Sequence, residues 1–148
     1  MDLERCKRAH AYHKKGFNCC QSVAAAFSDL TGLSENAICN AAAGFGAGAG
    51  TGELCGAVVG AIITLGLLTP VDMEDPVDSK KRTVALGKEL QKRFFEKGHA
   101  LRCQDLLADK TVPGDHAPAA MALGLTGHCD IMIVTAVELV EEILAERG

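Results

Sequence analysis

Aromatic residues are scarce in this chain of 148 residues, which contains no tryptophan, one tyrosine and five phenylalanines. A protein that holds single-stranded nucleic acid needs aromatic side chains on which the bases stack. The formal net charge of -4 is also opposite in sign to the basic surface that binds phosphates. We therefore expect no nucleic-acid partner.

Long apolar runs are also absent. The longest, residues 54–68, is shorter than the roughly 20 residues that a membrane-spanning helix requires. The segment from Met1 to Gly16 lacks the charged and then apolar residues of a secretory signal. We expect a cytoplasmic protein without a membrane partner.

Strand-like alternation of polar and apolar residues is missing, and no internal repeat is found. A length of 148 residues is typical of one domain. We predict an all-α fold, a compact multi-helix bundle that forms a single domain over residues 1–148. Apolar periodicity and capping residues predict helices over residues 2–15, 19–31, 35–43, 54–68, 80–97, 104–107 and 130–147. We expect solvated connectors over residues 70–79 and a long loop over residues 109–120.

The most unusual stretch is a glycine-rich loop that leads into the apolar helix over residues 54–68. Glycine occupies every second position from Gly44 to Gly52, which suits positive φ angles or close approach of the backbone to another group. Because the helix is apolar on every side, we expect it to be buried at the centre of the bundle.

Four residues of this stretch carry specific predictions. We predict Thr51 as the N-cap of the central helix and place Cys55 near the end of its first turn. Gly56 and Gly60 lie four residues apart, and so leave a flat strip that another helix or a bound group can approach.

Seven cysteines are more than a domain of this size needs for packing. In a reducing cytoplasm such residues are more often metal ligands or redox-active groups than disulfides. Four of them fall at or near predicted helix N-termini, where unpaired amides and the helix dipole favour a thiolate: Cys19, Cys55, Cys103 and Cys129. Glu53 opposes this effect at Cys55 by like-charge repulsion.

A second candidate cluster lies near the N-terminus. Cys6, His10 and His13 recur at helical spacing and share one face, which makes that face a candidate metal site. Leu3 and Phe17 continue the same stripe, so the pattern favours a half-buried face packed on the core.

The other histidines receive no firm role from the sequence. His99 lies four residues before Cys103 and His128 lies beside Cys129, so each is a candidate to act with a thiol or is ordinary helix-end surface. His116 lies in the predicted loop, where a lone histidine is more often merely exposed.

Three motifs and a lone cysteine occur in a fixed order, namely GFNCCQSV, ELCGAVVGAIITLGL, LRCQDLL and the cysteine that opens the last predicted helix. In this order they resemble the C_GCAxxG_C_C family of bacterial and archaeal redox-active proteins, over nearly the whole chain. The four family cysteines correspond to Cys19, Cys55, Cys103 and Cys129, and the CGAxxG core corresponds to Cys55, Gly56, Ala57 and Gly60.

This resemblance has two implications. Wider relatives of the family include a domain associated with multihaem cytochromes, which implies an iron–sulfur or electron-transfer role. Cys6, Cys20 and Cys39 lie outside the family pattern, which favours their interpretation as small buried core residues.

Three functions remain open. In the first, which we favour, the four cysteines hold an iron–sulfur cluster or another thiolate-bound metal, and the backbone approaches it at Gly50, Gly52, Gly56 and Gly60. In the second, the same four cysteines are a thiol–disulfide system in which Cys55 attacks, although no CxxC motif is present. In the third, the protein is a non-catalytic helical module with buried cysteines.

A nucleotide is not expected. GFGAGA is close to a dinucleotide-binding fingerprint, but it follows a predicted helix rather than a strand. The sequence identifies neither the redox partner protein nor the oligomeric state, and it leaves enzymatic activity open.

Overall fold

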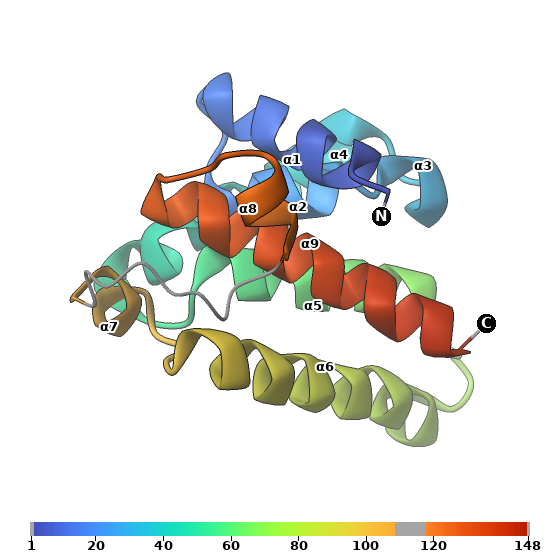
Figure 1. Cartoon of the computed structure of the whole chain (residues 1–148). Coiled ribbons are helices and arrows are strands. Elements are labelled where there is room, and N and C mark those ends of the chain that lie inside the picture. The colour runs from blue at the N-terminus through green and yellow to red at the C-terminus, as the bar shows by residue number, and fades with distance from the viewer. Residues whose placement is uncertain (1, 109–117, 148) are drawn as a thin grey trace.

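The computed structural model describes residues 2–108 and 118–147, and these residues fold almost entirely into helices (Figure 1). Within this part of the chain the only β pairing is one antiparallel bridge between Leu54 and Arg102, so the predicted all-α class is confirmed. The helices are α1 (Glu4–Lys14), α2 (Cys19–Ala25), α3 (Ser28–Thr31), α4 (Glu35–Ala42), α5 (Gly56–Leu68), α6 (Pro76–Gly98), α7 (Cys103–Ala108), α8 (Pro118–Ala122) and α9 (His128–Arg147).

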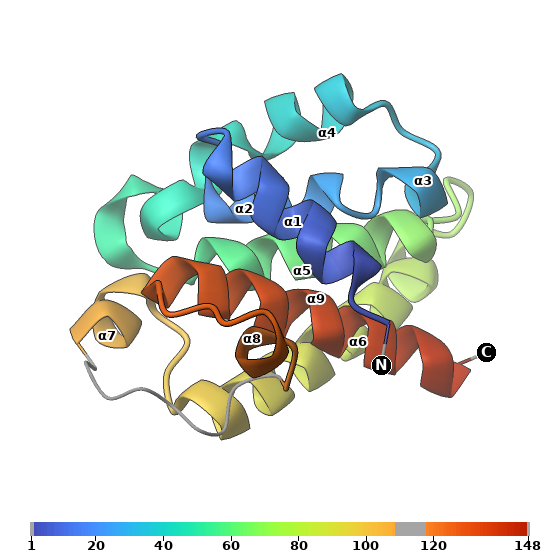
Figure 2. The ribbon, with the colours of Figure 1, turned by 45° about the horizontal axis from the view of Figure 1, so that its top comes forward.

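The helices form three layers. Helices α1 to α4 lie on one side, α5 and α9 lie in the middle, and α6 lies on the other side (Figures 1 and 2). The N-terminal ends of α5, α7 and α9 gather at one end of the molecule, at the left in Figure 1. None of the helices in the described ranges is long and apolar enough to cross a membrane.

Helix α5 is the central element, as the sequence predicts. It packs against α2, α6 and α9, and one continuous core joins these four helices. The largest side chains in that core are fully buried, because α2, α6 and α9 pack closely against α5. They include Phe27, Leu65, Leu90, Phe94 and Ile133.

The predicted flat strip on α5 is occupied by α2. A Cβ atom added to Gly60 would lie 2.7 Å from the carbonyl oxygen of Cys20 and 3.0 Å from Cβ of Val23. A Cβ atom on Gly56 would lie 2.9 Å from the carbonyl oxygen of Phe45. Only glycine therefore permits this approach of the two helices.

The predicted start of α5 is wrong by several residues. Its N-cap is Cys55. Thr51 instead lies in a turn over residues 48–52, where its hydroxyl donates a hydrogen bond to the carbonyl of Gly48 at 3.3 Å. The loop enters a left-handed conformation at Ala47 (φ 53°) and Ala49 (φ 58°), which is incompatible with a right-handed helix.

The predicted helix over residues 19–31 is interrupted between α2 and α3. The carbonyl of Ala26 accepts hydrogen bonds from the guanidinium groups of Arg5 at 2.7 Å and Arg8 at 3.1 Å. Both arginines also pair with Asp29, at 2.7 and 3.0 Å. Side chains from α1 thus compensate for the helical hydrogen bonds that are lost at the break.

Two further boundaries differ from the prediction. Helix α6 begins at Pro76 rather than at residue 80, because Asp75 caps it by accepting a hydrogen bond from the amide of Asp78 at 3.3 Å. The predicted loop over residues 109–120, with His116, lies mostly outside the described residues, but its end at residues 118–120 belongs to α8.

Candidate functional site

The four cysteines that the sequence singles out line one cavity. Its volume is about 130 Å³, and its other walls are formed by Ala47, Gly56, Leu106, Leu107, His128 and Met132. Each cysteine stands at a helix start, as predicted: Cys19 is the first residue of α2, Cys55 the N-cap of α5, Cys103 the first residue of α7 and Cys129 the second residue of α9.

A capping box holds Cys19 in place. The amide of Gln21 donates to Oδ1 of Asn18 at 2.9 Å, and the amide of Asn18 donates to Oε1 of Gln21 at 3.0 Å. The side-chain amide of Asn18 also donates to the carbonyl of Ala43 at 2.9 Å. The start of α2 is thereby tied to the glycine-rich loop that covers one side of the cavity.

Two backbone hydrogen bonds hold Cys55 beside Cys103. The amide of Cys55 donates to the carbonyl of Leu101 at 2.8 Å, and the amide of Cys103 donates to the carbonyl of Glu53 at 2.6 Å. An ion pair between Arg102 and Glu53, at 3.1 Å, spans the same bridge.

Sequence reasoning missed this pairing, because Glu53 and Arg102 lie 49 residues apart. The two segments Glu53-Leu54-Cys55 and Leu101-Arg102-Cys103 each carry a leucine, a charged residue and a cysteine, and the two charges are opposite. The bridge pairs Leu54 with Arg102, so the two opposite charges lie one position apart across it and are close enough to form their ion pair.

Cys19 and Cys129 form a hydrogen-bonded pair on the other side of the cavity. The Cys19 thiol donates to the sulfur of Cys129, and this bond is the main reason why the pKa of Cys129 lies below that of an ordinary thiol. The charge of His13 lowers the pKa of Cys129 further, while burial and Asp130 oppose the shift. The same bond and burial raise the pKa of Cys19, so the negative charge of the pair lies on Cys129.

Burial is the largest influence on the pKa of the other two cavity cysteines, Cys55 and Cys103. It raises the pKa of Cys55 to about 11. The amides of Val58 and Ala57 favour the thiolate and partly oppose this shift. No side-chain hydrogen bond caps α5. Burial also raises the pKa of Cys103, and repulsion by Cys129 adds to it. The predicted effect of a helix start on thiol pKa is therefore outweighed at Cys55 and Cys103.

The glycines predicted to approach a cofactor occupy different surroundings. Gly56 lines the cavity, whereas Gly60 contacts α2. A Cβ atom on Gly52 would lie 3.1 Å from Cβ of Gln104 in α7, and a Cβ atom on Gly50 would meet open space.

The side chains of the predicted face, Cys6, His10 and His13, do not converge on one point. Cys6 is buried and its thiol donates to the carbonyl of Val134 at 3.8 Å, which confirms its core role. His13 Nδ1 lies 2.6 Å from Oδ1 of Asp130, and His10 Nε2 lies 3.7 Å from Oδ2 of the same carboxylate. Sequence reasoning missed this pairing, because Asp130 lies 117 residues beyond His13.

The remaining cysteines are core residues, as predicted. Cys20 is fully buried and Cys39 is 8% exposed. Burial raises the pKa of both Cys6 and Cys20 to about 12. Within residues 2–108 and 118–147, no group of three histidine, cysteine or acidic side chains is arranged to hold a single metal ion.

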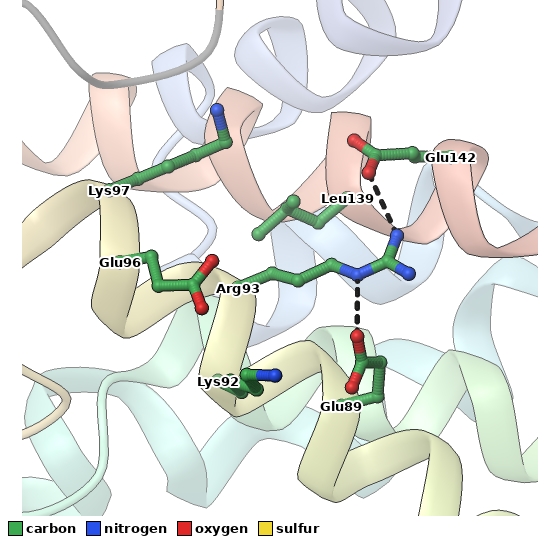
Figure 3. A pocket seen from close by; sticks show the side chains of 7 residues that line it. All are labelled: Glu89, Lys92, Arg93, Glu96, Lys97, Leu139 and Glu142. Carbon is green, nitrogen blue, oxygen red and sulfur yellow. Dashed lines mark hydrogen bonds and ion pairs between the residues drawn. The ribbon is translucent and has the colours of Figure 1, made fainter.

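A larger hollow lies between α6 and α9 and contains no cysteine (Figure 3). Its volume is about 510 Å³, and Arg93 crosses it to pair with Glu89 at 3.0 Å, Glu142 at 2.8 Å and Glu146 at 2.8 Å. These ion pairs tie α6 to α9, so we interpret the hollow as a structural contact on the surface.

Comparisons with known proteins agree with the cysteine pattern. The family model described as "Putative redox-active protein (C_GCAxxG_C_C)" matches residues 17–143, which include the four cysteines of the cavity. Searches of curated proteins and of solved structures gave no match.

Proposed function

Because the chain belongs to the C_GCAxxG_C_C family of redox-active proteins, we propose that its four cavity cysteines bind an iron–sulfur cluster, or another thiolate-bound metal centre, for electron transfer. The observation that carries this proposal is that Cys19, Cys55, Cys103 and Cys129, which are far apart in the sequence, line one cavity. Such a centre supplies one-electron redox chemistry when it is bound.

The residues around the cavity fit a centre of several atoms. Four thiols are the ligand set that iron–sulfur clusters require. A single metal ion needs three or four ligands that converge on one point, whereas here the cysteines surround a void of about 130 Å³. The spacing therefore favours a multinuclear centre over a mononuclear one.

The surroundings of the cysteines also suit a redox centre. Leu106, Leu107 and Met132 give the cavity an apolar wall, in which Leu106 and Met132 are buried and Leu107 is 52% exposed. The amides of Ala57 and Val58 favour negative charge on the sulfur of Cys55. Hydrogen bonds to ligand sulfurs and exclusion of water are the two main ways in which a protein sets a reduction potential.

The test is metal and acid-labile sulfide analysis, with a visible spectrum, on protein purified without oxygen. We expect iron, sulfide and charge-transfer bands in the wild-type protein, and a loss of them when any one of the four cysteines is replaced by serine. Cys39→Ser is the matched control, because Cys39 is buried and lies outside the cavity. Unchanged metal content in the Cys55→Ser protein would contradict the proposal.

A specific observation favours thiol–disulfide exchange as the second candidate. Cys19 and Cys129 both line the cavity, and the interaction between their thiols lowers the pKa of Cys129 to about 6. We assign the attack to Cys129 rather than to Cys55, because burial disfavours a thiolate at Cys55.

The balanced step needs an oxidised partner with a disulfide. The Cys129 thiolate attacks one sulfur of that disulfide and forms a mixed disulfide, while the other partner sulfur leaves as a thiolate. Cys19 then attacks the sulfur of Cys129, and the reduced partner is released as a dithiol. Counting free thiols before and after reduction, with mapping of the disulfide by mass spectrometry, tests this candidate. Two fewer thiols, at Cys19 and Cys129, in colourless protein would support it.

The site and the composition together suggest a setting for this function. Free thiols persist in a reducing cytoplasm, and we propose a redox protein there as the partner that exchanges electrons with the cysteines. Protein that holds neither metal nor a reducible disulfide would leave the non-catalytic helical module as the remaining explanation.

A further inference from the structure

The pair formed by His13 and Asp130 adjoins Cys129 through Asp130, and neither side chain is among those that line the cavity. Asp130 follows Cys129 in the first turn of α9, and α1 packs along α9 so that His13 reaches it. The distance of 2.6 Å between Nδ1 of His13 and Oδ1 of Asp130 is that of a strong, charge-assisted hydrogen bond. Both side chains are only partly exposed, at 30% and 23%.

The two side chains act on Cys129 in opposite directions. Asp130 is one residue from Cys129 in the first turn of α9, so its carboxylate disfavours negative charge near that sulfur, and the imidazole bonded to this carboxylate offsets that charge. The bond between them fixes both groups, because Asp130 accepts the hydrogen that Nδ1 of His13 carries. His13 therefore both orients the carboxylate and offsets its charge.

The histidine lies outside the part of the chain that the family model matches. The family model begins at residue 17, whereas α1 ends at Lys14. The match therefore covers the four cysteines but not His13, which α1 brings to Asp130.

We propose that His13 is a positioning residue of the cysteine site, which offsets the negative charge of Asp130 beside Cys129 and so raises the reduction potential of the site. This inference rests on the proposed function, since it assigns a potential to the centre that the four cysteines hold. A reduced centre carries more negative charge than an oxidised one, so a nearby carboxylate lowers the potential and a group that offsets it raises the potential.

The test measures the midpoint potential of the loaded protein in four variants: His13→Gln, Asp130→Asn, the double variant and His10→Gln. We expect His13→Gln to lower the potential by the equivalent of about tenfold in the redox equilibrium constant, or 59 mV for a one-electron couple. We expect Asp130→Asn to raise it, because the amide oxygen still accepts the bond from His13 but the charge is gone. The double variant should fall between the two single variants.

His10→Gln is the matched control. His10 lies on the same helix and faces the same carboxylate, but at 3.7 Å rather than 2.6 Å. We expect a smaller shift than for His13→Gln. A general loosening of the fold would move the potentials of the His13→Gln and Asp130→Asn proteins in the same direction, and that result, or the absence of any shift, would overturn the inference.

Failure of the proposed function gives a different result. If no metal binds, the potential of the Cys19–Cys129 dithiol is measured by equilibration with glutathione, where tenfold corresponds to 29.6 mV. Shifts of opposite sign in the same two variants would support the role of His13 while the metal proposal fails. Protein with neither a metal centre nor a reducible disulfide would overturn both.

Discussion

Position on a helix does not by itself decide the charge of a cysteine in this protein. Cys55 and Cys129 both stand at helix starts, yet burial raises the pKa of the first to about 11 and a hydrogen bond from Cys19 lowers that of the second. The partner of a thiol and its exposure therefore outweigh the helix dipole here.

The first prediction at this scale concerns thiol reactivity. In reduced, metal-free protein at neutral pH, iodoacetamide should modify Cys129 first, because the thiolate is the reacting form. Below neutral pH the reaction at Cys129 should persist after ordinary thiols have stopped reacting, since its pKa is lowered. Peptide mapping by mass spectrometry measures both effects. Cys6 should remain unmodified, and earlier labelling of Cys55 than of Cys129 would contradict the assignment.

A second residue-scale prediction concerns the left-handed loop. Ala49 has a φ of 58°, a conformation that costs an L-residue about 1–2 kcal/mol more than glycine. We expect Ala49→Gly to raise the free energy of unfolding, by less than about 1 kcal/mol after the added entropy of the unfolded chain is subtracted. Urea denaturation measures this change. Ala41→Gly, in the exposed part of α4, should instead lower the stability by about 1 kcal/mol.

At the scale of elements, the contact of α2 with α5 depends on the glycine strip. Replacing Gly60 by leucine forces the side chain against the backbone of Cys20, which cannot move away without displacing α2. We expect a loss of about 1–3 kcal/mol or more in the free energy of unfolding, measured by urea denaturation. Gly44→Ala is the control, because a Cβ atom there meets no neighbour within 4 Å. Equal stability of the two variants would show that α2 is not held this closely.

The attachment of α1 to α3 predicts a dependence of stability on pH. The hydrogen bond from Arg5 lowers the pKa of Asp29 from 3.8 to about 2. A carboxyl group with a lowered folded-state pKa stabilises the fold above its unfolded pKa, and this contribution is lost as the pH falls toward about 2. We expect the melting temperature to fall less between pH 5 and pH 2 in Asp29→Asn than in the wild type. An identical fall in both proteins would mean that the pair contributes nothing.

The whole molecule shows which structural features can be predicted from a single sequence and which cannot. Helix ends with a local cap, such as Asn18 before α2 and Ser34 before α4, were predictable because cap and helix are neighbours in the sequence. The start of α5 was not predictable, because an alanine in the sequence does not indicate the left-handed backbone that Ala47 and Ala49 adopt.

The candidate site likewise has residues that the sequence could identify and contacts that it could not. The four cysteines could be selected from their positions before helices and from the family pattern, and the structure brings them to one cavity. Their partners could not be selected. The contact of His13 with Asp130 and the bridge of Leu54 with Arg102 join residues that only the packing of the helices brings together.

Metal removal provides a prediction for the molecule as a whole. A centre held by four cysteines would connect α2, α5, α7 and α9, so its binding energy would add to the stability of the complete fold. We expect chelation of the metal to lower the melting temperature of the loaded wild type by several degrees and to leave that of the Cys103→Ser protein unchanged. A melting temperature that does not respond to chelation would show that the four helices gain no stability from a centre.

The bridge between Leu54 and Arg102 also dictates an order of assembly. It can close only after α6 has been synthesised and has folded back along α5, which returns the chain to the end where α5 begins. Cys129 lies still later in the chain, so the fourth cavity cysteine is present only after the other three and the helices between them have been synthesised. A cofactor bound by all four cysteines would therefore be delivered only after Cys129 has been synthesised and α9 has packed against α5.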